Sequence, residues 1–296
     1  MSQEINERVN FKISGSDLNV EDGYDLYYLS QSMEVFHQLI EKTYLTLKDE
    51  KYMSRNRRED LKIKVFNIKP GSFEADFVIT VSHVYPSLLP IVTSLTAENI
   101  WKIAKESFDY LKVIFQANQR GEEIYMENNN TGDVNVYNVK GDLLINTHPD
   151  VVTTAVETYP TYKKMANLID EKDKTFEKAE FSDYKSSSNL IKIGVEEKML
   201  LQNKNIIEEE PIEFIGKIFN ADANKNSGKL EVLDSKDIPT GEYSFEFLDK
   251  RSREVKEFFD EKGEFSALKE SAFNPNTLKK SINKLRIVKV YPSKND

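Results

Sequence analysis

The hydrophobic residues of the first 120 positions follow two different periods, and this switch constrains the fold more than any other feature. Between residues 26 and 47 they recur every three or four positions, which predicts a long amphipathic helix capped by Asp22 or Asp25. Around residues 9–13 and 61–79 they alternate instead, which predicts half-buried strands. With a second helix predicted over 97–117, the order indicates an α+β domain at residues 1–120. We expect its antiparallel sheet to carry two helices on one side.

The second segment, residues 121–172, predicts a β-hairpin and helix connector. Short apolar runs flank the polar turn 138–142, and a helical pattern over 150–170 contains Pro160, which predicts a kink. An isolated two-stranded hairpin is marginal in water, so we expect this one to pack on a neighbour. A second copy of the chain is one candidate. The charged stretch 170–178 predicts a linker.

Residues 173–296 predict a small β-barrel domain, because short strands recur at near-regular spacing. The predicted strands lie near 190–195, 212–219, 230–232, 243–247, 255–259 and 285–290, with a short helix near Pro275. Some small barrels of this kind bind nucleic acid, and Tyr243, Phe245 and Phe247 would then be the stacking candidates. Their strict alternation favours packing into the barrel core.

Few residue types that usually build catalytic or metal sites are present. The chain has no cysteine, and His37, His83 and His148 lie far apart in segments of different kinds. The carboxylate runs 196–197 and 208–210 lack a diagnostic spacing and are interpreted as solvated charges. The sequence therefore predicts no metal and no cofactor, and indicates a protein that works by contact and is not an enzyme.

The composition also suggests where the protein works and what it avoids. The N-terminal residues contain no apolar core of a secretory signal, and no apolar run reaches the roughly 18 residues of a membrane span. We therefore expect a cytoplasmic protein with no membrane association. A net charge of −9 argues against direct binding to nucleic-acid duplexes, although a local basic patch would change that expectation.

Two polar segments are candidates for protein contacts. Arg55, Arg57 and Arg58 belong to a basic cluster between the first helix and the next strand, which suits an acidic partner. The alternative interpretation is a solvated loop. The second segment is the predicted hairpin turn with Asn138, Lys140 and Asp142, a candidate for self-association.

The order of several motifs supports a resemblance to a known group of proteins. A GSF turn precedes a helix that contains Trp101, and the stretches NNNTGDVNVYNVKGDLLIN, IPTGEYSFEF and LRIVKVYP follow. This layout resembles proteins of bacterial genomes and mobile elements with an α/β front and a five-stranded-barrel tail. It is similar to the phage proteins that counter the Gabija defence system. The resemblance spans the whole chain in length and layout, and contains no catalytic motif.

The resemblance implies a non-enzymatic inhibitor encoded by a phage and acting in the host cytoplasm. Such a protein assembles as a homo-oligomer around the host nuclease–helicase complex and blocks its access to DNA. Two other functions stay open from the residues. One is a nucleic-acid-binding protein that uses the C-terminal barrel and its basic tail, with Lys279, Lys280 and Lys284. The other is an enzyme whose carboxylates meet only in the fold.

Overall fold

The chain divides into two compact units, described separately below. The N-terminal unit comprises Met1–Gln202 with Pro275–Leu278, and the C-terminal unit comprises Asn203–Asn274 with Lys279–Asp296. The computed structural model describes residues 5–19, 23–54, 57–69, 73–82, 95–128, 132–184, 186–203, 205–222, 224–249, 259 and 261–292. The fold is α+β with a C-terminal β-barrel, as the sequence predicts.

A five-stranded antiparallel sheet forms the base of the N-terminal unit. Its strand order is β10-β9-β1-β5-β4, so that the first strand of the chain lies at the centre. The strands are β1 (Ile5–Ser14), β4 (Leu61–Lys69), β5 (Glu74–Val81), β9 (Lys178–Asp183) and β10 (Ser186–Ile193). A short antiparallel pair, β2 (Leu18–Asn19) and β3 (Gly23–Tyr24), follows β1.

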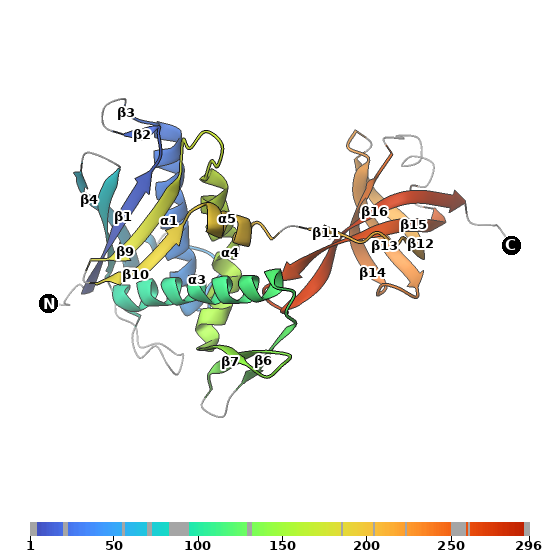
Figure 1. Ribbon diagram of the computed structural model, residues 1–296, viewed down its shortest axis with the longest axis horizontal. Coiled ribbons are helices and arrows are strands. Elements are labelled where there is room, and N and C mark those ends of the chain that lie inside the picture. The colour runs from blue at the N-terminus through green and yellow to red at the C-terminus, as the bar shows by residue number, and fades with distance from the viewer. Residues whose placement is uncertain are drawn as a thin grey trace. The chain divides into compact units, whose positions relative to one another are not determined.

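Helices gather on one side of this sheet (Figure 1). The helices are α1 (Leu26–Leu47), α2 (Arg57–Asp60), α3 (Ala97–Gln119), α4 (Pro149–Leu168) and α5 (Val195–Leu201). Asp25 caps α1, because its carboxylate accepts a hydrogen bond from the Tyr27 N–H at 2.7 Å. This confirms one of the two predicted caps; Asp22 lies outside the described residues. None of the helices in the described part of the chain has the length and apolar character to span a membrane.

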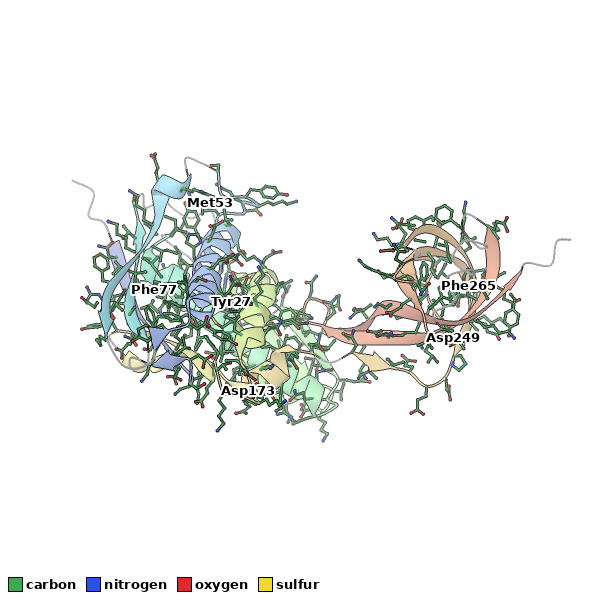
Figure 2. The ribbon with its side chains drawn as sticks, turned by 90° about the horizontal axis from the view of Figure 1, so that it is seen from above. Tyr27, Met53, Phe77, Asp173, Asp249 and Phe265 are labelled. Atoms are coloured by element: carbon green, nitrogen blue, oxygen red, sulfur yellow. The ribbon has the colours of Figure 1, made fainter. Side chains whose placement is uncertain are left out.

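Aromatic rings from four distant segments form the core between helices and sheet. Phe36 of α1 stacks on Phe77 of β5 at 4.4 Å between ring centroids and on Phe181 of β9 at 5.2 Å. Phe11 of β1 stacks on Phe181 at 5.0 Å, and Phe77 lies between the sheet and α1 (Figure 2). Such pairs add about 0.5–1.5 kcal/mol each to the free energy of burial. The helix and the strands therefore form one folding unit.

The boundary of the C-terminal part differs from the predicted one at residue 173. Strands β9 and β10 complete the N-terminal sheet, because Ala179, Phe181 and Ile191 continue its buried face. The stretch predicted as a linker is also structured: Phe176 is fully buried, and the Glu177 N–H donates to the Ser14 carbonyl at 2.7 Å. Because the stretch is rich in charged residues, the sequence pattern did not reveal that Phe176 is buried.

The connector contains three strands where a two-stranded hairpin was predicted. The strands β6 (Ile124–Asn128), β7 (Val134–Asn138) and β8 (Leu143–Thr147) form an antiparallel sheet in that order. β6 follows α3 directly, and its mostly exposed residues gave no alternation to reveal it. The predicted helix with its internal Pro160 is α4.

The C-terminal unit is a closed five-stranded barrel. Its strands are β12 (Ile212–Asp222), β13 (Ser227–Ser235), β14 (Gly241–Phe247), β15 (Lys262–Asn274) and β16 (Lys279–Pro292), and the short β11 (Ile206–Ile207) pairs with β15. The ring runs β12-β13-β14-β16-β15 and closes from β15 to β12. Only the β14–β16 pair is parallel among these described pairings. Numbered from β12, this is the order 1-2-3-5-4-1 with strands 3 and 5 parallel, the connectivity of the OB-fold.

The barrel departs from the predicted elements in its second half. Residues 275–278 form a turn between β15 and β16, where a helix was predicted from Pro275. β15 was not predicted, because its buried positions include Gly263, Glu270 and Ser271 and so lack a clean apolar alternation. The strand predicted over 255–259 falls on residues outside the described ones, except for Phe259, which bridges to Ile218.

Candidate protein-interaction surface

The three-stranded sheet of β6, β7 and β8 has one face anchored on the N-terminal unit. Val134 and Val136 are buried on this face, and Ile124 lies opposite Asn138 on the same side. The Tyr110 hydroxyl of α3 contacts the Met126 sulfur at 3.6 Å as a hydrogen-bond donor. Burial raises the pKa of Tyr110, which keeps this donor protonated. The sheet therefore has an inner face that packs on the N-terminal unit and an outer face with exposed side chains among its described residues.

The outer face presents a row of large apolar side chains, one from each strand. Tyr125 lies opposite Tyr137, which in turn lies opposite Leu143. The two tyrosine rings stack at 5.6 Å. Tyr125 is 40% exposed and Leu143 is 53% exposed, and we call these three residues the apolar row. Val139, in the adjoining turn, is 61% exposed. Grouped apolar side chains of this kind are typical of protein contact sites.

The turn at the end of this sheet uses two of the three predicted contact residues internally. The Asn138 carbonyl oxygen, Oδ1, accepts hydrogen bonds from the N–H groups of Lys140 at 3.0 Å and Asp142 at 2.9 Å. Its amide Nδ2 donates to Asp142 Oδ2 at 3.0 Å. Gly141 takes a φ of +87°, which few other residues adopt readily. Asn138 and Asp142 thus fix the turn shape, and the exposed Lys140 and Val139 are presented by it.

The predicted basic cluster is divided between a short helix and a strand. Arg55 lies outside the described residues, and Arg57 begins α2. Arg58 is exposed on the same helix, with its N–H donating to the Ser54 carbonyl at 3.3 Å. Lys62, the next basic residue along the chain, belongs to β4, so the basic residues do not form one continuous loop. As contacts for an acidic partner, these arginines stay a prediction.

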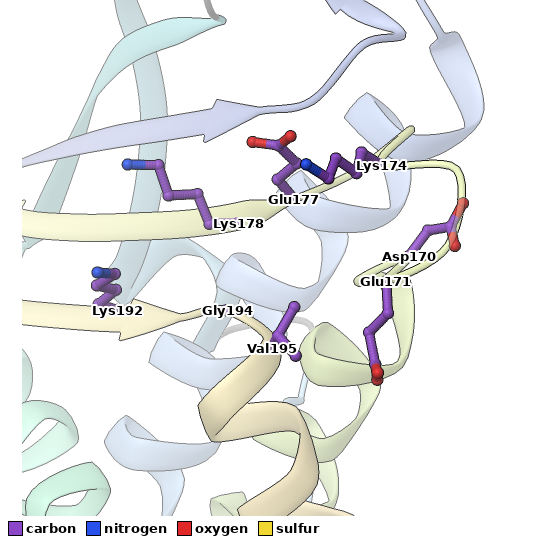
Figure 3. Close-up of a pocket in the computed structure, with 8 residues that line it drawn as sticks. All are labelled: Asp170, Glu171, Lys174, Glu177, Lys178, Lys192, Gly194 and Val195. Atoms are coloured by element: carbon purple, nitrogen blue, oxygen red, sulfur yellow. The ribbon is translucent and has the colours of Figure 1, made fainter.

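A charged hollow of about 320 Å³ lies where the loop after α4 meets β9 and β10 (Figure 3). Its lining includes Asp170, Glu171, Lys178 and Lys192. Hydrogen bonds from the Lys172 N–H at 3.0 Å, from the Thr175 hydroxyl and from a further backbone N–H lower the pKa of Asp170. Glu171 forms an ion pair with Lys198, with 3.3 Å between the Lys198 Nζ and the Glu171 Oε1. These acids therefore stabilise the loop around the hollow.

The residues considered for catalysis or metal binding do not form one cluster, and the described ones contact structural neighbours. The His37 side chain is 57% exposed and lies beside Glu41. The Nδ1 of His148 accepts a hydrogen bond from the Asp150 N–H at 3.2 Å and so caps α4. His83 is not among the described residues. Within the described ranges, no three His, Cys, Asp or Glu side chains group closely enough to hold a metal. Glu197 differs from its interpretation as a solvated charge, since it is buried and paired with Lys112 at 3.0 Å.

The barrel keeps its candidate stacking residues inside. Phe245 and Phe247 are 1% and 5% exposed, which confirms the interpretation that they pack in the core. Tyr243 is half-buried, and its hydroxyl donates to the Pro239 carbonyl at 2.9 Å. The exposed residues of β13 and β14, the strands whose outer face binds oligonucleotides in many OB-folds, carry no aromatic ring. They are Lys229, Glu231, Asp234, Glu242 and Ser244.

No protein-family model, curated protein or solved structure matches this chain.

Proposed function

We propose that this protein is a non-enzymatic, protein-binding inhibitor that acts as a homo-oligomer. The observation that carries the proposal is the apolar row of Tyr125, Tyr137 and Leu143 on a sheet whose other face is anchored on α3. A fixed β-sheet that exposes tyrosine and leucine side chains has the composition of an interface core. The layout of the chain and its resemblance to Gabija-countering phage proteins support an anti-defence role.

Self-association through this sheet needs more area than the apolar row offers. Stable interfaces bury about 1,600 Å² in total, so the apolar row serves as the centre and polar neighbours as the rim. Asn135 and Asn146 lie beside the row and hydrogen-bond to each other, and Glu127 is exposed on β6. Lys140 and Val139 extend the surface at the turn. This arrangement suits a contact with a second copy of the same chain.

The proposed target is a host nuclease–helicase complex of the Gabija type. A protein with 50 acidic and 41 basic residues competes electrostatically with DNA when it surrounds a DNA-binding complex. The inhibitor would act in the cytoplasm of an infected cell and block access to DNA without chemistry of its own.

The test is a tagged pull-down from bacteria that carry a Gabija-type system, followed by the native mass of the eluted species. We expect the nuclease and the helicase in one large stoichiometric assembly. Leu143→Glu should reduce that mass by preventing self-association, because it places a charge in the interface centre. Leu248→Glu is the matched control, since Leu248 is similarly exposed at 48% and lies in the C-terminal unit.

A monomer that retains neither protein would overturn the proposal. An assembly that Leu143→Glu and Leu248→Glu leave equally intact would remove the apolar row as its basis. Circular dichroism and thermal melting of both variants establish that each remains folded.

One observation favours a second candidate function. The barrel has the connectivity of the OB-fold, which supports nucleic-acid binding through the C-terminal unit. Joint charge reversal of Lys279, Lys280 and Lys284 should then abolish a salt-dependent affinity for single strands. The acidic side chains on β13 and β14 count against this candidate.

A further inference from the structure

The five-stranded sheet has a second face, turned away from the helices, that differs in charge from the rest of the chain. In β1, Val9, Phe11 and Ile13 are fully buried toward the helices, so the even-numbered residues of this strand face outward. The strand register extends this assignment across the sheet. Arg8 lies in one row with Val78 and Lys64, and Lys12 lies in another with Glu74 and Glu180.

The charged side chains of this outer face are mostly basic. Among the described residues, this face carries seven cations and three carboxylates. The excess is four positive charges, on a chain whose net charge is −9. The cations are Arg8, Lys12, Lys62, Lys64, Lys69, Lys178 and Lys192, and the carboxylates are Glu74, Asp76 and Glu180. We call this set the basic face.

The carboxylates of the basic face are already engaged. Lys69 pairs with Glu74 at 2.5 Å, and the Glu74 pKa is lowered chiefly by this hydrogen bond. Lys178 pairs with Glu180 at 3.2 Å. Asp76 of β5 is 2% exposed and accepts a hydrogen bond from the Asn67 amide at 2.8 Å.

Three lysines of the basic face are open to a ligand. Lys62 and Lys64 on β4 and Lys192 on β10 are exposed, and none forms an ion pair with another described residue. Figure 3 shows Lys192 beside Lys178, on neighbouring strands. The free cations therefore stand at both edges of the sheet, on β4 and β10.

Two aromatic rings are exposed on this basic face. Tyr184 follows β9 and is 62% exposed, with the Arg8 guanidinium 5.2 Å from its ring centroid. Phe66 on β4 is 44% exposed. From a strand spacing of about 4.8 Å and a rise of about 3.4 Å per residue, the two positions lie roughly 16 Å apart. Positive charges on the same face as separated aromatic rings form the arrangement on which single-stranded nucleic acids bind.

We propose that the basic face binds single-stranded nucleic acid, with Phe66 and Tyr184 stacking on bases and the lysines contacting phosphates. A duplex keeps its bases stacked inside and offers the rings nothing to stack on. An acidic peptide would satisfy the lysines but not the two rings. This inference is independent of the proposed inhibitor function, because it concerns a different sheet and requires no partner protein.

The test uses the full-length protein and a fluorescein-labelled single-stranded 20-mer, followed by fluorescence anisotropy over a series of salt concentrations. We expect measurable affinity at low salt that falls as salt rises. Tyr184→Ala and Phe66→Ala should each weaken binding by about tenfold, as expected for the loss of one stacking partner. Joint replacement of Lys62 and Lys64 by glutamine should reduce the slope of log affinity against log salt by roughly 0.7 for each phosphate that the protein no longer neutralises.

The matched control replaces the exposed Lys236 and Lys262 of the C-terminal unit by glutamine, which removes the same charge from the chain elsewhere. This control should leave affinity and salt slope unchanged. An absence of binding at low salt would overturn the proposal. So would a result in which the control variant loses affinity and the Lys62 and Lys64 variant does not. Equal affinity for a duplex, or for polyglutamate of matched charge, would also overturn it, because either result removes the need for base stacking.

Discussion

Replacing Glu197 with glutamine tests how an internal ion pair joins α5 to α3. The Lys112 Nζ lies 3.0 Å from Glu197 Oε1, and the Gly194 N–H donates to Glu197 Oε2 at 3.1 Å. The Glu197 side chain is 8% exposed and that of Lys112 is 32% exposed. Glutamine retains the shape of the side chain and its acceptor for Gly194, so the substitution removes mainly the charge.

The magnitude follows from the burial of the pair. Removing one member of a fully buried pair costs about 3–5 kcal/mol, whereas exposed pairs contribute about 0–1 kcal/mol. Because Lys112 is about one-third exposed, we expect Glu197→Gln to lower the free energy of unfolding by about 1–2 kcal/mol at pH 7.

The effect should depend on pH with a definite sign. Burial by itself would raise the pKa of Glu197, but hydrogen bonds from Lys112 and Gly194 outweigh it and hold the pKa below its ordinary value of 4.5. A carboxylate with a lowered folded pKa contributes stability above its unfolded pKa, and this is lost as the pH falls through the folded pKa. The difference between wild type and Glu197→Gln should therefore narrow below about pH 4.5.

Trp101 provides the assay, because it is the only tryptophan of the chain and is buried on α3. Its fluorescence during urea titration follows the N-terminal unit and not the barrel. Lys112→Met and the double variant complete a double-mutant cycle that isolates the pair. Equal unfolding midpoints at pH 7 would refute the reasoning. So would a difference that stays constant down to about pH 3.5.

Three further substitutions test other parts of the fold. Gly228→Ala places a Cβ against the backbone carbonyl of Asn220 in β12, so it should destabilise the barrel by about 1–3 kcal/mol or more. We expect faster proteolysis of the C-terminal unit, while the urea-induced change in tryptophan fluorescence keeps its midpoint. Asp25→Ala removes the cap of α1 and should cost about 1 kcal/mol in the urea assay. Tyr162→Phe removes a buried hydroxyl that donates to the Ala104 carbonyl at 2.6 Å and should cost about 0.5–1.5 kcal/mol in the same assay.

The helices and the central strands could be predicted because their apolar residues have a clear period. The pattern over residues 26–47 and the alternation at Val9, Phe11 and Ile13 each reflect one buried face. β6 and β15 escaped prediction because most residues of β6 are exposed and β15 buries Gly263 and Glu270. Periodicity detects a strand only when its two faces differ in polarity.

The proposed interaction surface contains the hairpin that the sequence offered as a candidate for self-association, but its apolar row was not predicted. The hairpin around the turn 138–142 was predicted to associate because a hairpin alone is marginal, and the structure adds a third strand, β6, and a contact with α3. Asn138 and Asp142 were candidates for protein contacts because they are polar residues in a turn. Such residues most often hydrogen-bond to the backbone of their own turn. Tyr125 and Leu143 become neighbours of Tyr137 only once the strand register is known.

Net charge is a weak guide to partners when a sheet gathers residues from separate segments. The basic face takes its cations from β1, β4, β9 and β10, and an apolar residue follows most of them in the chain. Alternation sends those neighbours to the opposite face, so the sequence shows isolated cations where the surface gathers them. The value of −9 excludes a uniformly basic protein, but it does not exclude a basic face that spans five strands. The outward residues of each strand therefore decide which ligand the sheet prefers, and they make single-stranded nucleic acid the ligand to test first.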